Sequence, residues 1–341
     1  MTAINGNIVK KIAIVKLSAL GDVVHALVAL QFIKNQFPFL QIDWIVEASF
    51  SAVLENNPHI NTIYKVNLKN IKKDKFSIFK QIKVIREIAK NQYDMVIDAQ
   101  GLFKSAIVSK LLKSTVVGFD KNSIRESFAS SFYTHKVTIS YESNAIDRNV
   151  KVLSQALNIE ITQDDIINKK AFLFYKNEDK TIYNFISKDK KNILFVIGAS
   201  KKNKMYSKEK FANIIKNINA NSLIIWGNQE EKEMAFFIAS KSEAKVLPKI
   251  DLNSVKALIS KVDLVIGNDT GPTHMAWALN VASITLFGNT PGYRNTYRTN
   301  INKVIESDTK VNPLCLDKND FSIREIEEEK IIELAKSLLD G

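Results

Sequence analysis

Short apolar runs without polar interruption alternate with longer amphipathic stretches along most of the chain, and this alternation restricts the fold more than any other feature. Strands that are apolar on both faces are typical of a parallel sheet covered by helices on both sides. In the first half, the predicted strands are residues 11–17, 42–46, 61–66, 95–98 and 115–118. The helices predicted between them are residues 23–37, 50–56, 76–90 and 103–112. The first half is therefore predicted to be a doubly wound α/β domain.

The same alternation restarts after a polar, lysine-rich stretch at residues 158–191. The predicted strands are residues 193–197, 222–226, 264–268 and 282–287, and the predicted helices are residues 208–217, 230–240, 252–260, 272–279 and 323–339. A length of 341 residues suits two such domains. We therefore predict two Rossmann-like domains, residues 1–175 and 176–341, and allow the last helix to pack back on the first domain.

Composition excludes several classes of protein. The single cysteine, Cys315, cannot form an internal disulfide, and the four histidines lack the spacing of zinc ligands, so no metal is predicted. Neither a signal peptide nor an apolar run long enough to span a membrane is found, which predicts a cytoplasmic protein. Neither G-x-G-x-x-G after the first strand nor G-x-x-x-x-G-K-[ST] is present, which argues against dinucleotide dehydrogenases and P-loop NTPases.

The formal net charge of +12 favours contact with a polyanion, such as nucleic acid, anionic lipid or a phosphorylated substrate. The ordinary alternative is a lysine-rich surface exposed to solvent. Nucleic-acid binding requires aromatic stacking platforms or a known binding module. The basic run at residues 69–75 has no interleaved aromatic residue, so no nucleic-acid partner is predicted.

Polar residues follow two predicted strands of the first half, where ligands bind in doubly wound sheets. Gly21 permits a tight turn and Asp22 opens a helix, so Asp22 is either a helix cap or a carboxylate general base. Asp98 ends the strand at residues 95–98, and Gln100 and Lys104 follow it. They either orient an acceptor sugar and its anionic groups or cap the next helix.

The most informative loop of the second half follows the strand at residues 264–268. Pro272 suits the first helical position and Gly271 lets the backbone approach a ligand. The amides near Thr273 and His274 are predicted to bind an anion such as a diphosphate. Asp269 would repel phosphate and is predicted to accept hydrogen bonds from sugar hydroxyls, unless it is a cap.

Two further loops of the second half carry charge. Residues 198–204 form a small-residue turn with the Ser200 hydroxyl and three lysines, including Lys204, which suits a leaving diphosphate or an exposed basic turn. Glu230 and Glu231 start the helix after the strand at residues 222–226. One of them is predicted to meet a ribose diol, although pairing with the helix dipole explains the same residues.

Together these motifs resemble the ADP-heptose transferases of lipopolysaccharide core synthesis, glycosyltransferase family 9, over nearly the whole chain. The residues that carry the resemblance are Ile14-Val15-Lys16, Ser18, Leu20-Gly21-Asp22-Val23, Asp43-Trp44-Ile45-Val46-Glu47, residues 96–102, Arg125-Glu126, Ala129-Ser130, Phe132-Tyr133, Asp269-Thr270-Gly271 and His274. The resemblance implies the GT-B fold, two Rossmann-like domains facing a cleft, without a cofactor. It also implies a monomer that contacts the inner membrane peripherally at its cytoplasmic face.

The resemblance further implies an inverting transfer of L-glycero-D-manno-heptose from ADP-heptose to Kdo of Kdo-lipid A. The alternative, which uses the same donor, adds the second heptose to a core that already carries one. It stays open because Gly198-Ala199-Ser200 stand where the family commonly has threonines, Tyr206-Ser207 where Trp-Pro is frequent, and Pro272-Thr273 where Leu-Ser is usual. Residues 96–102 and Arg125-Glu126 favour the first-heptose enzyme.

Matched positions assign a role to each site residue. Asp22 matches the base, and Arg125 with the basic loop at residues 65–75 matches the acceptor side. The donor side is Ser200, Lys204, Glu231, Asp269, Thr270, Gly271 and His274.

Overall fold

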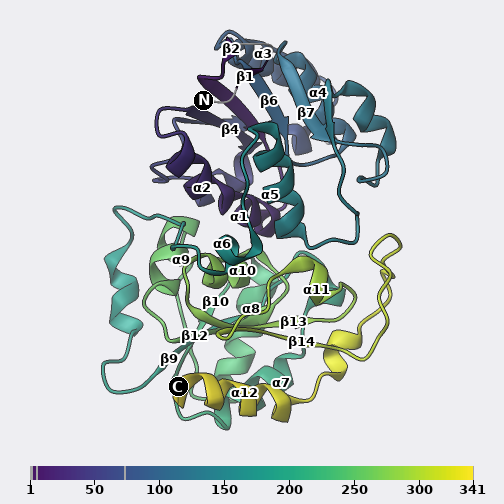
Figure 1. The fold of residues 1–341 in the computed structure, drawn as a ribbon. Coiled ribbons are helices and arrows are strands. Elements are labelled where there is room, and N and C mark those ends of the chain that lie inside the picture. The colour runs from purple at the N-terminus through teal and green to yellow at the C-terminus, as the bar shows by residue number, and fades with distance from the viewer. Residues whose placement is uncertain (1–2, 5–6, 73, 341) are drawn as a thin grey trace. The chain divides into compact units, whose positions relative to one another are not determined.

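The chain folds into two compact units in the computed structural model, residues 1–172 and 173–341 (Figure 1). The model describes residues 3–4, 7–72 and 74–340, so Lys73 of the predicted basic loop lies outside the described residues. The predicted domain boundary at residue 175 falls just beyond the observed one. The assignment of the first domain to the acceptor and the second to the donor stays a prediction.

Unit 1 contains a six-stranded parallel sheet with the order β5-β4-β3-β6-β7-β8. The strands are β3 (Lys11–Val15), β4 (Gln41–Glu47), β5 (Thr62–Val66), β6 (Met95–Asp98), β7 (Thr115–Phe119) and β8 (His135–Val137), preceded by a small antiparallel pair, β1 (Ala3–Ile4) and β2 (Asn7–Ile8). The central strands β3 and β6 are almost wholly buried, as their unbroken apolar sequences predict. The short edge strand β8 is not predicted by the sequence pattern.

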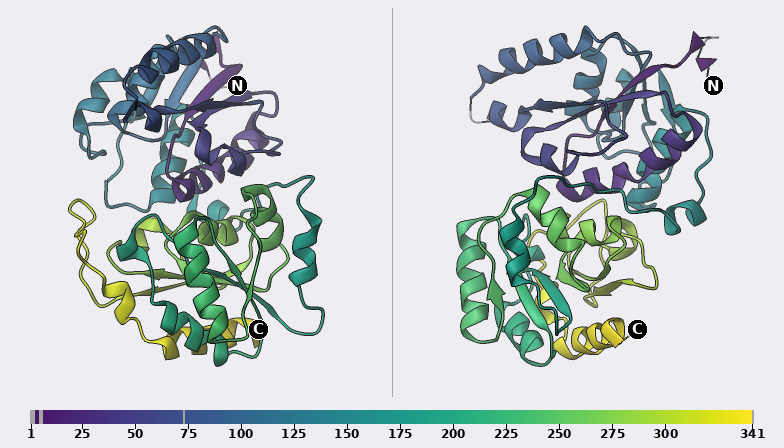
Figure 2. Two further views of the ribbon diagram at one scale, coloured as in Figure 1. Left: turned by 180° about the vertical axis from the view of Figure 1, so that it is seen from behind. Right: turned by 90° about the vertical axis from the view of Figure 1, so that its left-hand side faces the viewer.

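Helices cover both faces of this sheet (Figure 2). The helices of unit 1 are α1 (Leu20–Leu27), α2 (Ala29–Gln36), α3 (Ser77–Ala89), α4 (Phe103–Leu111), α5 (Ala145–Ala156) and the short α6 (Gln163–Ile167), with 3-10 helices η1 (Ala48–Val53), η2 (Leu68–Lys72) and η3 (Ser127–Phe132). The single helix predicted at residues 23–37 is wrong, because the helix starts three residues earlier and divides at Val28. The helix predicted at residues 50–56 is a 3-10 turn, and α5 was not predicted.

Unit 2 repeats the strand order of unit 1, with a parallel sheet β11-β10-β9-β12-β13-β14. Its strands are β9 (Asn192–Val196), β10 (Asn221–Ile225), β11 (Lys245–Val246), β12 (Leu264–Asn268), β13 (Ala282–Phe287) and β14 (Asn302–Glu306). Its helices are α7 (Lys208–Lys216), α8 (Gln229–Ser240), α9 (Leu252–Ile259), α10 (Gly271–Ala278), α11 (Gly292–Asn295) and α12 (Glu328–Asp340), with 3-10 helices η4 (Lys180–Phe185), η5 (Lys202–Lys204) and η6 (Ser322–Glu325). The predicted terminal helix at residues 323–339 is thus a 3-10 turn followed by α12.

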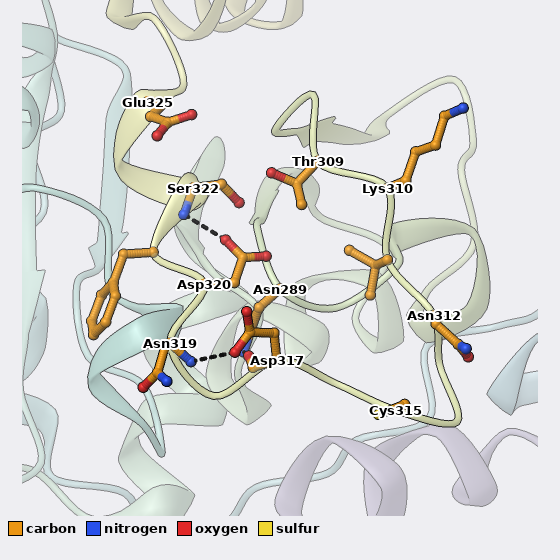
Figure 3. Close-up of a pocket in the computed structure, with 12 residues that line it drawn as sticks. Asn289, Thr309, Lys310, Asn312, Cys315, Asp317, Asn319, Asp320, Ser322 and Glu325 are labelled. Atoms are coloured by element: carbon orange, nitrogen blue, oxygen red, sulfur yellow. Dashed lines mark hydrogen bonds between the residues drawn. The ribbon is translucent and has the colours of Figure 1, made fainter.

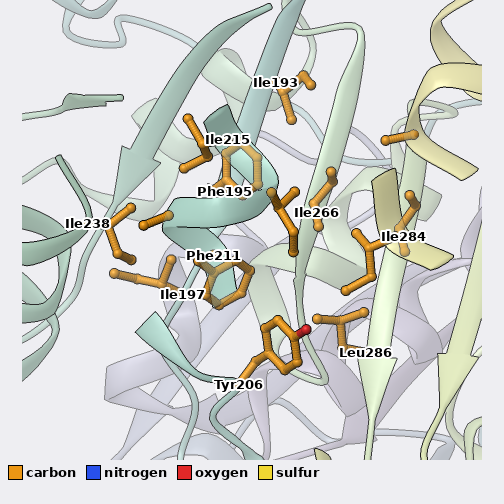
Figure 4. Close-up of a cluster of buried hydrophobic side chains, with 14 of the residues drawn as sticks. Ile193, Phe195, Ile197, Tyr206, Phe211, Ile215, Ile238, Ile266, Ile284 and Leu286 are labelled. Carbon is orange, nitrogen blue, oxygen red and sulfur yellow. The ribbon is translucent and has the colours of Figure 1, made fainter. Parts of the chain in front are cut away.

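The core of unit 2 lies between its sheet and helices α7 and α12 (Figure 4). The Phe211 ring meets the rings of Phe195 and Tyr206 edge-on, with centroid distances of 6.1 and 5.2 Å. Ile331 and Ala335 of α12 are fully buried in the same cluster, so the last helix packs on its own unit. The sequence had allowed this helix to pack on the first domain instead.

Tyr206 also anchors the chain between η5 and α7, because its hydroxyl donates to the carbonyl of Ile326 at 2.7 Å.

None of the described helices has both the length and the apolar character needed to cross a membrane.

Candidate active site

Four loops of unit 2 lie side by side at the carboxyl edge of its sheet. They follow β10, β9, β12 and β13, which are consecutive neighbours in the strand order. Because the carboxyl ends of parallel strands meet at one edge, the charged residues of these loops are brought together from segments far apart in sequence. Three of these loops carry residues that the sequence predicts to bind the donor.

Asp269 is the centre of a network that joins three of these loops. Its Oδ2 accepts from Lys204 Nζ at 2.5 Å and from the Thr290 hydroxyl at 2.9 Å. Its Oδ1 lies 3.0 Å from Nε2 of His274. A carboxylate has about four lone-pair sites, of which these contacts use three. Asp269 therefore has about one lone-pair site left to accept from a sugar hydroxyl. Its predicted contact with the sugar stays a prediction.

The charge state of Asp269 follows from its surroundings. Burial alone would raise the pKa of this carboxyl, but the charge of Lys204 and the hydrogen bond and charge of His274 hold the pKa well below its usual range. Asp269 is thus ionised and can only accept hydrogen bonds. We infer that His274 Nε2 carries a hydrogen and donates it. The network fixes the direction of the Lys204 and His274 side chains.

Asn268, the last residue of β12, holds both ends of the loop that contains Ser200 and Lys204. Its Nδ2 donates to the carbonyl of Ile197 at 2.7 Å, and its Oδ1 accepts from the amide of Tyr206 at 3.1 Å. Ser200 itself is exposed at the tip of the loop. Neither Asn268 nor Thr290 was predicted as a site residue, although both follow the rule that functional side chains gather where parallel strands end.

The start of α10 supplies backbone donors beside this network. Thr270 is the N-cap residue and Gly271 and Pro272 are the first two helical residues. The amide of His274 donates to the carbonyl of Thr270 at 3.2 Å, so this amide is occupied, and the anion site expected near Thr273 and His274 stays a prediction. Helix geometry instead leaves the amides of Gly271 and Thr273 without an intrahelical acceptor, since proline has no amide hydrogen.

Glu231 lies beside the loop at residues 198–204 and hydrogen-bonds to groups at the start of its own helix, α8. Its carboxylate accepts from the amide of Gly227 at 2.7 Å and from the side chain of Asn228 at 2.9 Å. It also lies over Gly198, where an added Cβ would be 2.3 Å from the carboxyl carbon. A larger residue at position 198 would therefore displace the Glu231 carboxylate, and the predicted ribose contact of Glu231 stays a prediction.

In unit 1, Asp22 lies in the first turn of α1. Ala19 is the N-cap residue, and Oδ2 of Asp22 accepts from its amide at 3.0 Å. Asp22 is therefore the third helical residue of α1, whereas the sequence placed it at the helix opening. The carboxyl group is partly exposed, and one oxygen is held by the helix start. The other oxygen, Oδ1, is the one that would accept a proton from a substrate hydroxyl.

Asp98 and Gln100 shape the loop that follows β6. Asp98 is fully buried and accepts from the amides of Gln100 and Gly101 at 2.9 and 3.1 Å and from the Tyr133 hydroxyl at 2.9 Å. Burial raises the pKa of this carboxyl, although these donors oppose the shift. An acceptor could reach Asp98 only by exchanging these bonds, so its predicted contact stays a prediction without support from the geometry.

Gln100 ties this loop to the start of α1. Its side-chain oxygen accepts from the amides of Leu17 and Ser18, both at 3.0 Å. Lys104 Nζ lies 3.4 Å from the hydroxyl of Ser18. The loops after β3 and β6, which carry Asp22 and the predicted acceptor residues, therefore form one connected surface within unit 1.

Two further residues set the charge of this surface. Arg125 is exposed on the loop before η3. Glu47, at the end of β4, is almost fully buried, and burial raises the pKa of its carboxyl against the opposing charges of Lys104 and Lys69. Its Oε1 accepts from the Lys69 amide at 3.1 Å. The predicted basic loop is thus attached to the strand edge through Glu47.

A cavity of about 600 Å³ lies between the loops after β13 and β14 (Figure 3). It borders the loop at residues 198–204, because Asn203 of that loop donates to the carbonyl of Asp317 at 3.4 Å. Asp317, Asp320 and Glu325 line it together with Asn289. Lys310 is the one lysine that lines the cavity. Three carboxyl groups beside a single lysine repel an anion, so they disfavour phosphate binding. We therefore place no diphosphate there. Within the described part of the chain, no cluster of three or more potential metal-ligating side chains is found.

Comparisons with known proteins agree with this geometry. The family model described as glycosyltransferase family 9 (heptosyltransferase) matches residues 81–320. The chain is 41% identical to lipopolysaccharide heptosyltransferase 1 of Campylobacter coli, over 96% of this chain and 98% of that protein. It is 31% identical to lipopolysaccharide heptosyltransferase 1 of Escherichia coli O18:K1:H7, over 85% of this chain and 90% of that protein.

The fold is also found in solved structures. A structure of the E. coli heptosyltransferase WaaC with ADP has a TM-score of 0.78 and 25% sequence identity, and the match covers 96% of this chain and 99% of that chain. The two parallel six-stranded sheets are therefore those of the GT-B type, as the sequence predicts.

Proposed function

We propose a specific sugar transfer for this chain, which belongs to glycosyltransferase family 9, the heptosyltransferase family, and is a glycosyltransferase. The donor is ADP-L-glycero-D-manno-heptose and the acceptor is Kdo of Kdo-lipid A, so the product carries the first heptose of the lipopolysaccharide inner core. The observation that carries this proposal is the 41% identity, along nearly the whole chain, to a protein named lipopolysaccharide heptosyltransferase 1.

The donor side of the proposal rests on the loops of unit 2. Lys204 is held by Asp269, and this bond uses one of its three N–H donors. The remaining donors, the Ser200 hydroxyl and the free amides at the start of α10 supply a positive environment for the diphosphate. As the glycosidic bond breaks, negative charge grows on the leaving ADP. Fixed donors of this kind stabilise that charge without a metal ion.

The acceptor side rests on Asp22. Its Oδ2 is held by the Ala19 amide, which orients Oδ1 to accept the proton of the attacking Kdo hydroxyl. Direct attack on the anomeric carbon inverts its configuration. Arg125, Lys104 and the basic loop before α3 supply cations for the Kdo carboxylates and the lipid A phosphates. Because the acceptor is an anionic glycolipid, we propose a monomer in the cytoplasm that binds the inner membrane peripherally.

An acceptor assay tests this proposal. The protein is incubated with ADP-heptose and either Kdo-lipid A or its mono-heptosylated form, and the added heptose is detected by mass spectrometry. We expect transfer to Kdo-lipid A in preference to the mono-heptosylated form. Preferential transfer to the mono-heptosylated form would assign the second heptose instead. Transfer to neither acceptor would overturn the proposal.

A further inference from the structure

Helix α3 has an outer face that is unusual for a helix at a protein surface. The helix buries Ser77, Gln81, Ile85 and Ile88 against unit 1. Phe76 and Phe79, one turn apart at its start, are 82% and 69% exposed. Large aromatic side chains seldom remain in water one turn apart without a partner. Figure 2 shows α3 at the surface of unit 1 in both views.

A second group of aromatic rings lies nearby. Phe103 at the start of α4 and Phe128 in η3 are 43% and 68% exposed. Their rings and that of Phe132 lie 5.7 to 5.9 Å apart, centroid to centroid. Tilted and edge-on packing at these distances stabilises a fixed arrangement. The three rings therefore form one apolar cluster.

The two groups share one edge and one side of the sheet. The segments that carry them follow β5, β6 and β7, whose carboxyl ends lie at the same edge. Helix α3 packs beside α4, and α4 packs beside η3. Asp22 follows β3 at this same edge, so the aromatic side chains lie on the edge of unit 1 that carries the proposed base.

Cations surround these aromatic side chains. Residues 65–83 contain seven lysines and one acidic residue, Asp74. Lys75, Lys80 and Lys83 are exposed on or before α3, and Arg125 is exposed before η3.

The two nearby carboxylates are bound to backbone amides. Asp74 accepts from the Phe76 amide at 3.0 Å, and Glu126 accepts from the Phe103 amide at 2.7 Å. The groups that face outward are therefore mainly phenylalanine rings and lysine or arginine side chains.

We propose that Phe76, Phe79, Phe103 and Phe128, with the cations around them, form a surface that docks unit 1 onto an anionic lipid bilayer. Phenylalanine rings insert at the boundary between headgroups and acyl chains, while lysines bind anionic headgroups. Each lysine near such a surface raises partitioning by about fivefold. This inference rests on the proposed function, because docking brings the base edge of unit 1 to an acceptor that is itself a membrane lipid.

Vesicle binding tests this surface. The full chain is sedimented with vesicles of phosphatidylcholine alone and with vesicles of phosphatidylcholine and phosphatidylglycerol. We expect binding to the anionic vesicles that weakens as salt rises, because the attraction is screened. The double substitution Phe76→Ala with Phe79→Ala should lower that binding at least about tenfold, because two large apolar side chains no longer insert.

The matched control is Phe39→Ala. Phe39 is 94% exposed but precedes β4, so it lies at the opposite edge of the same sheet. Its removal should leave vesicle binding unchanged. Equal binding by the parent and the double variant would overturn the proposal, as would an equal loss in the Phe39→Ala variant. A change from dimer to monomer in the double variant would assign the surface to a second copy of the chain and also overturn it.

A water-soluble acceptor separates this inference from the proposed function. With deacylated Kdo acceptor, the double variant should transfer heptose as fast as the parent, and with Kdo-lipid A in anionic vesicles it should be at least about tenfold slower. Loss of transfer to both acceptors would place the phenylalanines in the transfer site and overturn the docking role. If the parent transfers to neither acceptor, the proposed function fails, whereas vesicle binding still decides the docking surface.

Discussion

The two sheets have the same strand order, yet the aspartates at or just after the ends of two corresponding strands have opposite surroundings. Strand β6 lies next to β3 in unit 1 as β12 lies next to β9 in unit 2. Asp98 at the end of β6 meets neutral donors, and burial raises the pKa of its carboxyl. Asp269 after β12 meets Lys204 and His274, which lower the pKa of its carboxyl. One fold thus supports a loop held by neutral hydrogen bonds and a loop held by paired charges.

This difference matches the chemistry proposed for each unit. Paired charges hold a lysine where a diphosphate would lie, and the lysine keeps further donors for that anion. Neutral hydrogen bonds instead shape the loop whose Gln100 holds the amides of Leu17 and Ser18, next to Asp22. We infer that Asp269 holds its loop by pairing with charged side chains, whereas Asp98 fixes the backbone conformation of its loop through neutral hydrogen bonds.

Replacing each aspartate by asparagine separates charge from shape. Asp269→Asn leaves Lys204 without its carboxylate, and breaking a buried ion pair typically costs about 3–5 kcal/mol. Asp98→Asn keeps an oxygen for the two amides, so we expect a loss of only about 1–2 kcal/mol. Urea unfolding of both variants measures the free energy of unfolding. Equal losses would contradict the distinction.

Lys204→Met removes the charge while keeping most of the side-chain length. We expect the turnover rate to fall about 10²–10³-fold, as for loss of one well-placed donor to a transition-state anion. ADP affinity, measured by calorimetry, should fall as well. Lys202→Met is the matched control, because Lys202 lies in the same loop but forms an exposed pair with Glu230. It should change turnover little.

Asp22→Asn tests the proposed general base of unit 1, the unit that also contains Asp98. The amide oxygen can still accept from Ala19, so the helix start should remain intact, whereas the proton acceptor is lost. We expect turnover at least about a hundredfold slower with ADP affinity unchanged. Turnover near that of the parent would remove Asp22 from this role.

The pH dependence of stability gives the smallest effect and has opposite signs for the two aspartates. The pKa of Asp269 is lowered on folding, so its contribution is present above the unfolded value of about 4 and is lost as pH falls below it. The pKa of Asp98 is raised, so the parent loses stability as pH rises from about 4 through the higher folded value. The gap in stability between the parent and Asp269→Asn should therefore shrink as pH falls. The gap between the parent and Asp98→Asn should shrink as pH rises.

Sequence patterns predict the buried strands well. The strands at residues 95–98, 264–268 and 282–287 have the predicted bounds, because unbroken apolar runs between polar turns admit few alternatives. Edge strands such as β8 and β14 are short or mixed in polarity, and they depend on neighbours that the sequence does not identify.

Helix α5 was missed although its signals are present. The side chain of Asn144 accepts from the amide of Ile146, which marks a helix start. Ile146, Val150 and Leu153 follow at helical spacing and are buried. The sequence therefore contains the signals for this helix, and no tertiary contact is needed to identify it.

The site residues divide in the same way. Asp269, Lys204 and His274 are predicted as site residues because they follow strand ends. Their contacts with one another confirm that they lie together. Thr290 was missed because it reaches Asp269 from a different loop, which local patterns cannot relate to it. The role of Asn268 depends on two partners more than 60 residues away, so it too requires the folded sheet.

Asn268 has a consequence for how this family member can vary. Surface loops commonly tolerate insertions and deletions, because lengthening them costs little. The loop from Ile197 to Tyr206 differs, because the Asn268 side chain binds both of its ends. The amide group donates to one end and accepts from the other, and these two roles cannot be exchanged. A residue added or removed there would pull one end out of reach, so this segment is constrained in length even where its individual side chains are free to change.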